Sequence, residues 1–199
     1  MSIEPPAPPG AAPATSAAVA SPAYTWAALA VAVLTVLGAF YLSFVEGKFP
    51  CPLCFYQRAF ALGVVGVLAA GLVSGVNARI SVATLALPVA SAGLGVALWH
   101  VHLVRTDVLV CPAGMFGIST APAQSMAAFG LLSAVLVLDA YQAGRQGNGF
   151  LPVVASVVLG FVLAAPCCLK LFNEQPKRPI PAQEYEDESP KICLPKKPA

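Results

Sequence analysis

Charged residues are scarce in this chain of 199 residues, where they make up 10% against 58% for apolar residues. The few lysines and arginines form no basic stripe with interleaved aromatic residues, which argues against a nucleic-acid partner. Only three methionines and two histidines are present, so no tract rich in either supports a metal carrier. The N-terminal segment lacks the basic n-region of a signal peptide, and we expect the first apolar run to be a retained membrane anchor.

Uncharged apolar runs dominate what is present. A bilayer core about 30 Å thick needs roughly 20 helical residues. Runs of that size recur at 26–45, 59–78, 80–104, 121–138 and 150–169. They do not alternate with period two, so helices rather than barrel strands satisfy the backbone in lipid. We therefore predict an all-α, polytopic membrane helical bundle. Its fourth span has the weakest signal, and Asp139 is expected to close it as a solvated end.

The two ends of the chain differ in composition from this central part. Residues 1–22 are rich in proline and alanine, which predicts a disordered tail. Residues 23–169 form the expected five-helix transmembrane domain. Residues 170–199 are polar, with an acidic cluster and several prolines, and read as a C-terminal tail. Because the loops are short, helices that follow one another in sequence are expected to be neighbours, with the fifth packed outside or across the first four.

The six cysteines all fall on one side of a five-helix arrangement. Cys51 and Cys54 lie in the first loop, Cys111 in the third, and the remaining three at or after the end of the fifth helix. Six thiols at one water interface indicate disulfide chemistry in an oxidising compartment. The distribution of lysine and arginine is nearly balanced and does not orient the chain. On the cysteines alone, the N-terminus is cytoplasmic and the C-terminal tail periplasmic, in a bacterial inner membrane.

The most informative motif is Cys-Pro-Leu-Cys-Phe-Tyr-Gln-Arg at residues 51–58. Two thiols three positions apart at a helix start can close a small disulfide and reopen it. The partial positive charge of a helix N-terminus favours the thiolate, and Pro52 suits the first helical position. Arg58 follows Cys54 by four residues on the same helix face and adds a second cationic influence. This pattern predicts a reactive dithiol at the membrane surface.

This motif resembles the signature of the disulfide bond formation protein B (DsbB-like) family of quinone-linked membrane thiol oxidoreductases. Support comes from Gly-Val-Ala-Leu-Trp-His-Val-His at residues 95–102, which ends the third span with histidine, and from Cys111 in the next loop. The resemblance covers about residues 24–142. It implies a four-helix family core, to which this chain adds a fifth transmembrane helix.

The resemblance also implies a relay of electrons. A periplasmic dithiol protein with a thioredoxin fold reduces the loop disulfide, which passes electrons to the Cys-x-x-Cys pair and then to a quinone, either ubiquinone or menaquinone. Cys54 would face the quinone and Cys51 would exchange with the other disulfide. Arg58 would bind a quinone carbonyl, because an arginine near lipid needs such a partner. Either His100 or His102 would serve the same site, with His102 preferred.

The chain departs from the family pattern in its cysteines. The family's third loop usually carries two cysteines, whereas this one carries only Cys111. The missing partner is expected in the C-terminal region, with Cys193 the leading candidate and Cys167 or Cys168 as alternatives. Six cysteines allow fifteen pairings, so the sequence leaves the connectivity open. The predicted catalytic residues are Cys51, Cys54, Cys111 and Cys193, with no metal site.

Two other functions remain open at this stage. The chain could be a non-catalytic subunit of a larger membrane complex that keeps this fold. It could also be a soft-metal transporter using Cys167 and Cys168, because thiolates select soft ions. The favoured hypothesis is an enzyme, a quinone-dependent protein-disulfide oxidoreductase whose surroundings are membrane lipid.

Overall fold

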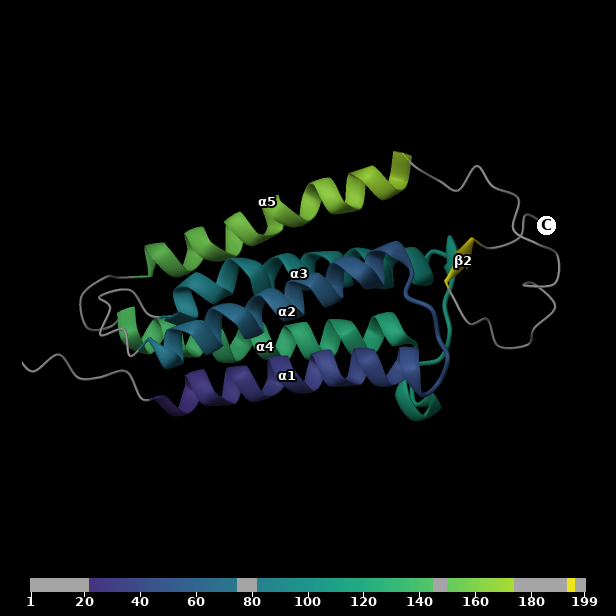
Figure 1. Cartoon of the computed structure of the whole chain (residues 1–199). Helices are drawn as coiled ribbons and strands as arrows, with labels where there is room; N and C mark the ends of the chain where they lie inside the picture. The colour runs from purple at the N-terminus through teal and green to yellow at the C-terminus, as the bar shows by residue number, and fades with distance from the viewer. Residues whose placement is uncertain (1–21, 75–81, 145–149, 174–192, 196–199) are drawn as a thin grey trace, which may run out of the picture.

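The computed structural model describes residues 22–74, 82–144, 150–173 and 193–195 (Figure 1). Its five long helices are α1 (Pro22–Phe44), α2 (Pro52–Val73), α3 (Val82–Arg105), α4 (Ala121–Gly144) and α5 (Leu151–Asn173). Each is long and apolar enough to cross a membrane, which confirms the predicted all-α membrane helical bundle. The expected N-terminal tail lies outside the described residues. So does most of the C-terminal tail, and the boundaries 1–22, 23–169 and 170–199 stay predictions.

The first four helices form a bundle in which α1 contacts α2 and α4, and α3 contacts α2 and α4. Helix α5 lies on the outside of this bundle, along α3 (Figure 1). Its outside position was predicted. The expectation that all sequential helices are neighbours is wrong for the last pair, because α5 packs mainly on α3 and barely touches α4.

Small residues explain why α5 chooses α3. A Cβ atom built on Gly160 of α5 would lie 2.5 Å from the carbonyl oxygen of Pro88 in α3. A Cβ atom on Gly95 of α3 would lie 2.9 Å from Cβ of Ala164 in α5. Close approach of helix backbones through small residues is the usual way in which membrane helices associate. The packing partner of α5 is therefore set by matching small residues rather than by chain order.

Helix α4 runs past the point where the sequence suggested that it would close. Asp139 lies inside the helix, which continues to Gly144, and its side chain is only 1% exposed. The hydroxyl of Thr25 in α1 donates a hydrogen bond of 2.8 Å to Oδ2 of Asp139. The expectation of a solvated helix end at Asp139 is therefore wrong, because a partner on the neighbouring helix satisfies the buried carboxyl group.

Two short strands tie the C-terminal segment to the third loop. Strand β1 (Leu109–Val110) pairs antiparallel with β2 (Leu194–Pro195), in the register Val110 opposite Leu194. The rest of that loop is held by Gln124 of α4. Its side-chain oxygen accepts from the Met115 amide at 2.8 Å, and its amide donates to the Met115 carbonyl at 3.1 Å. This register brings the residue after β1 next to the residue before β2.

Candidate active site

The Cys-x-x-Cys pair begins α2, as predicted from its sequence. Cys51 has an extended backbone and caps the helix, and its Sγ accepts a 3.3 Å hydrogen bond from the backbone amide of Cys54. Pro52 occupies the first helical position, where no N–H is needed. The two sulfurs lie 2.8 Å apart and both cysteines are free thiols. The hydrogen bond with Cys54, together with burial, raises the pKa of the Cys51 thiol.

Cys111 and Cys193 form a disulfide across 82 residues of sequence, with Cα atoms 4.1 Å apart. The structure thus confirms the predicted bridge between the third loop and the C-terminal segment. The β1–β2 pairing aligns the two backbones, so that Cys111, directly after β1, lies opposite Cys193, directly before β2. The disulfide predicted for Cys51 and Cys54 in the oxidised protein is open here. The structure therefore presents one disulfide beside one dithiol.

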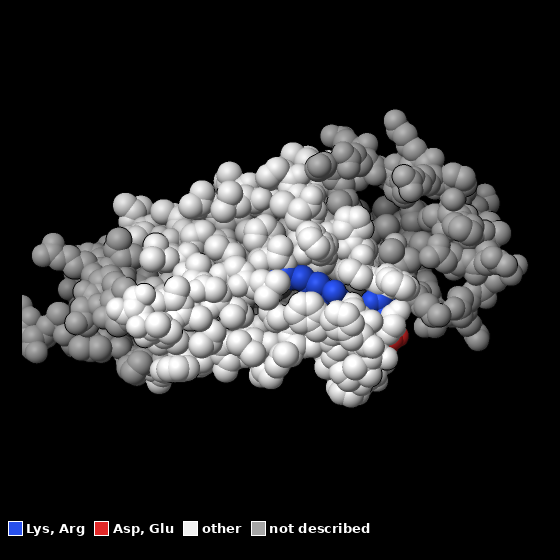
Figure 2. Space-filling model, in the orientation of Figure 1, with Lys and Arg blue, Asp and Glu red and all other residues white. Residues whose placement is uncertain are grey.

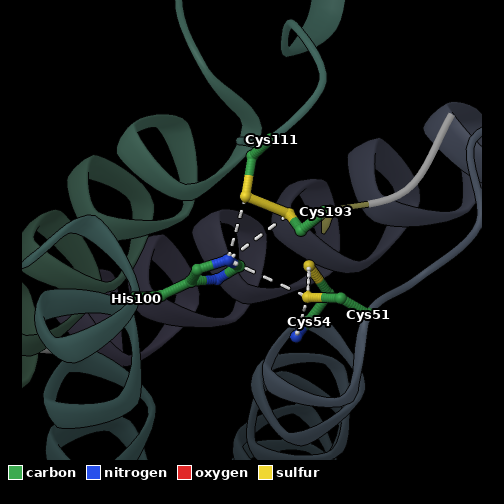
Figure 3. The surroundings of a disulfide bond; sticks show 5 residues. All are labelled: Cys51, Cys54, His100, Cys111 and Cys193. Carbon is green, nitrogen blue, oxygen red and sulfur yellow. Dashed lines mark hydrogen bonds between the residues drawn. A yellow bond between two sulfur atoms is a disulfide. The ribbon is translucent and has the colours of Figure 1, made fainter. Parts of the chain in front are cut away.

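His100 lies beside both the disulfide and the dithiol (Figure 3). Its Nε2 is 3.3 Å from Sγ of Cys111, 3.5 Å from Sγ of Cys193 and 3.9 Å from Sγ of Cys51. The imidazole is completely buried, and within the described ranges its Nδ1 has no hydrogen-bond partner. One ring nitrogen is thus close to both cysteine pairs.

His102 lies elsewhere, although it was the preferred candidate. Two residues along a helix correspond to a rotation of about 200°, so His100 and His102 face opposite sides of α3. The ring of His102 is exposed and stacks on Trp99 with centroids 5.5 Å apart. It lines a groove shared with Cys168 of α5, away from Arg58. Helical periodicity alone places the two histidines on opposite faces of α3, and the preference for His102 overlooked this.

A cavity of about 360 Å³ adjoins the dithiol. It lies among α1, α2 and α4, and Cys54 lines it whereas Cys51 does not. Arg58 also lines it, and its Nη2 donates to the Ala39 carbonyl at 2.7 Å and to Oγ of Ser43 at 2.6 Å. Most of the lining is apolar. In Figure 2 the described surface of the face shown is uncharged except for two small basic areas and one acidic spot.

Gln57 is a site residue that the sequence analysis did not single out. Its side chain is 4% exposed, lines the same cavity, and has no hydrogen-bond partner for Nε2 among the described residues. The signal was present, because Gln57 follows Cys54 by three residues and shares its helix face. This buried amide donor lies beside the cavity, where it can donate to an acceptor atom of a ligand.

The remaining cysteines complete one cluster. Cys167 and Cys168 near the end of α5 pack with Cys54 and Cys193 around a small buried core of Cys51, Leu53, Val96 and Ala164. Both are free thiols. All six cysteines therefore gather at one end of the bundle, as their positions in the sequence predicted.

The family profile described as "Disulfide bond formation protein DsbB" matches residues 22–135. This range covers more than half of the chain and includes Cys51, Cys54, Arg58, His100 and Cys111. The chain belongs to the DsbB family. The match ends inside α4, so α5 and Cys193 lie outside the matched range.

Relatives of the DsbB family agree with this assignment. The chain is 42% identical over 86 residues to "Disulfide bond formation protein B" of Herminiimonas arsenicoxydans, covering 42% of this chain and 54% of that protein. It is 38% identical over 86 residues to the protein of that name from Burkholderia pseudomallei (strain 1106a), covering 42% and 50%. The chain thus spans about half the length of the relatives it matches. No solved structure matches it significantly.

Proposed function

We propose that this chain is a membrane thiol:quinone oxidoreductase that reoxidises a periplasmic dithiol protein with a thioredoxin fold. The observation that carries the proposal is the position of the Cys51–Cys54 dithiol. The dithiol lies beside the Cys111–Cys193 disulfide and His100, and Cys54 also lines the cavity that holds Arg58. Electrons entering at the disulfide have a continuous path of sulfur atoms to that cavity.

The chemistry on the entry side is thiol–disulfide exchange. A thiolate of the partner protein attacks one sulfur of the Cys111–Cys193 bridge, forming a mixed disulfide as that bond breaks. The partner's second thiol then displaces the chain's cysteine. The partner leaves as a disulfide, and Cys111 and Cys193 carry away two electrons and two protons as thiols. In the oxidised enzyme, these thiols reduce a Cys51–Cys54 disulfide by the same pair of displacements.

His100 suits the proton movements that accompany these displacements. Each attack needs a thiolate and each leaving sulfur needs a proton. The Nε2 atom lies within 3.9 Å of one sulfur of the dithiol and of both sulfurs of the disulfide. Neutral imidazole accepts a proton from an attacking thiol and returns it to a leaving sulfur. Because the ring is buried, protons exchanged through it stay within the cluster.

The cavity fits a quinone head group. Its lining is mostly apolar, and its polar groups include the guanidinium of Arg58 and the orphaned amide of Gln57. Both are donors, and a quinone offers two carbonyl acceptors. A bound quinone would serve as a two-electron oxidant that also takes up two protons. Arg58 would hold a carbonyl and stabilise negative charge developing on it, while its bonds to Ala39 and Ser43 fix the direction of the fork.

The proposed setting is a bacterial inner membrane, with the cysteine end periplasmic and the N-terminus cytoplasmic. Membership in a larger membrane complex is compatible with this activity. The soft-metal transporter alternative has no specific support. Within the described residues, the one group of three or more candidate metal ligands omits Cys167 and Cys168.

The test is turnover of the purified full chain in detergent with a soluble ubiquinone analogue and a reduced thioredoxin-fold dithiol protein. One quinone molecule, measured by loss of its absorbance, should be reduced for every two partner thiols that are oxidised. Cys54→Ser should abolish quinone reduction. Cys167→Ser, which changes a free cysteine outside the proposed path, should retain it. Partner oxidation that is independent of quinone, or full activity in Cys54→Ser, would contradict the proposal.

A further inference from the structure

Four donor atoms at the centre of the cluster form a set that the relay does not explain. They are Sγ of Cys51, Cys54 and Cys193 and a ring nitrogen of His100, and all lie within 4.8 Å of one another (Figure 3). Cys51 and His100 are buried, and the other two are partly buried. Three thiolates and one imidazole form one of the ligand sets of closed, four-coordinate zinc sites.

We propose that the reduced chain binds one Zn²⁺ ion through Cys51, Cys54, Cys193 and His100. The distances favour a small tetrahedral ion. Zinc bonds of 2.0–2.3 Å place neighbouring ligand atoms roughly 3.5–3.8 Å apart. Nε2 of His100 already lies 3.5 Å from Cys193 and 3.9 Å from Cys51. The 2.8 Å separation of the Cys51 and Cys54 sulfurs is shorter than this and must widen. Cys54 borders the cavity, which gives its side chain room.

The site requires reduction because Cys193 is bonded to Cys111 in the structure. A dithiol reductant transfers two electrons and two protons to that bridge, releasing Cys111 and Cys193 as thiols while the reductant becomes a disulfide. Zn²⁺ then displaces the protons of the three cysteine thiols and takes the lone pair of neutral imidazole. The metal itself undergoes no redox change. The fully reduced chain should therefore bind zinc more tightly than the chain with the Cys111–Cys193 disulfide.

The consequence for activity rests on the proposed function. A thiolate bound to zinc is held in place and less available to attack a disulfide or to lose electrons. Zinc would thus trap the reduced enzyme, and dithiol oxidation would slow at zinc concentrations that saturate the site. The site itself does not depend on this consequence, because metal content is measurable in a chain with no turnover at all.

The experiment uses the full chain in detergent, free of quinone and under anaerobic conditions. One sample is reduced with a phosphine and another keeps the Cys111–Cys193 bridge. Both are equilibrated with Zn²⁺, passed through a desalting column and analysed for metal. The reduced chain should retain about one zinc ion and the bridged chain should lose it. Equal zinc in both samples, or none in the reduced chain, would overturn the proposal.

Two matched variants separate loss of a ligand from loss of the bridge. Cys111→Ser and Cys193→Ser both remove the disulfide, but only the second removes a proposed ligand. After pre-reduction, Cys111→Ser should bind zinc as tightly as the unmodified chain. Cys193→Ser should bind at least about a hundredfold more weakly, beyond the loss expected when a residue that only hydrogen-bonds to a ligand is changed. Equal affinities in the two variants would overturn the assignment of Cys193.

A third variant tests for zinc held by the other free thiols. The double change Cys167→Ser and Cys168→Ser leaves all four proposed ligands in place and should keep one zinc ion per reduced chain. If it abolishes binding, the proposed ligand set is wrong. Failure of zinc to bind would leave quinone-dependent turnover intact, so the two proposals fail separately.

Discussion

The family-matched region and the C-terminal region contribute differently to one cluster of cysteines. Residues 22–135 supply the dithiol, the histidine, the arginine and one cysteine of the disulfide. The C-terminal region supplies Cys193, the other cysteine of that disulfide, and α5 with its two free thiols. The comparison shows that the disulfide beside the dithiol need not come from one loop. A cysteine 82 residues away can fill the position when a short strand pair aligns it.

The means of attachment also differ between the two regions. Helices α1 to α4 hold one another by contacts around a shared apolar core. Cys193 is held by a disulfide and by the two-residue pairing of β1 with β2. Two such strands are marginal by themselves. Opening the disulfide leaves Cys193 held by the strand pair and by its packing on the buried core around Cys51, while the four-helix bundle keeps its own packing.

Replacing Cys193 by serine is expected to have the largest effect, because it removes the disulfide that joins the third loop to the C-terminal segment. If Cys193 acts in the relay, its replacement should reduce oxidation of the partner protein to the background rate. The midpoint of thermal unfolding should change little, since the bundle core does not include Cys193. Turnover with the dithiol protein and thermal unfolding in detergent are measured on the same sample. A large fall in the unfolding midpoint with turnover preserved would instead identify the bridge as a clamp.

Arg58→Lys tests the family-matched region alone. Lysine keeps the charge but cannot reproduce the planar fork that reaches Ala39, Ser43 and a ligand together. A hydrogen bond to a charged group contributes about 1.5–3 kcal/mol, so the KM for quinone should rise about tenfold or more. The KM for the dithiol protein should stay constant, because the hydrogen bonds described for Arg58 go to α1 and not to the disulfide. An unchanged KM for quinone would show that Arg58 does not bind the quinone.

Gly160→Ala tests how α5 is held on α3. The new Cβ would lie 2.5 Å from the Pro88 carbonyl oxygen and from Cβ of Ser91, so the helices must separate. Overpacking of this kind costs about 1–3 kcal/mol. Gly130→Ala in α4 is the matched control, because its Cβ meets nothing within 4 Å. Unfolding in detergent should begin earlier for the Gly160 variant only. Equal stability of the two variants would show that close packing at Gly160 is unimportant.

The sequence predicted what depends on local pattern and missed what depends on contacts between helices. The five spans, the helix start at Pro52 and the gathering of the cysteines followed from apolar runs, a capping motif and chain order. The seating of α5 on α3 depends on which small residues face each other, and hydropathy does not contain that information. Asp139 was misread because its partner, Thr25, is far away in sequence. Helical periodicity counted from Cys54 places Gln57 on the same helix face. Counted from Trp99, it places His102 on the face of Trp99 and leaves His100 on a different face.

Thr25→Val is expected to have the smallest effect, and it concerns the end of the bundle opposite the cysteines. It removes the only hydrogen bond described for Asp139 without changing the side chain's shape. Interhelical hydrogen bonds in membrane proteins contribute about 0.6 kcal/mol on average, so the midpoint of unfolding should fall only slightly. Thr25→Ser keeps the hydroxyl and should behave like the unmodified chain. Turnover should not change in either variant. A loss of turnover in Thr25→Val alone would instead link the buried carboxyl group to the redox reaction.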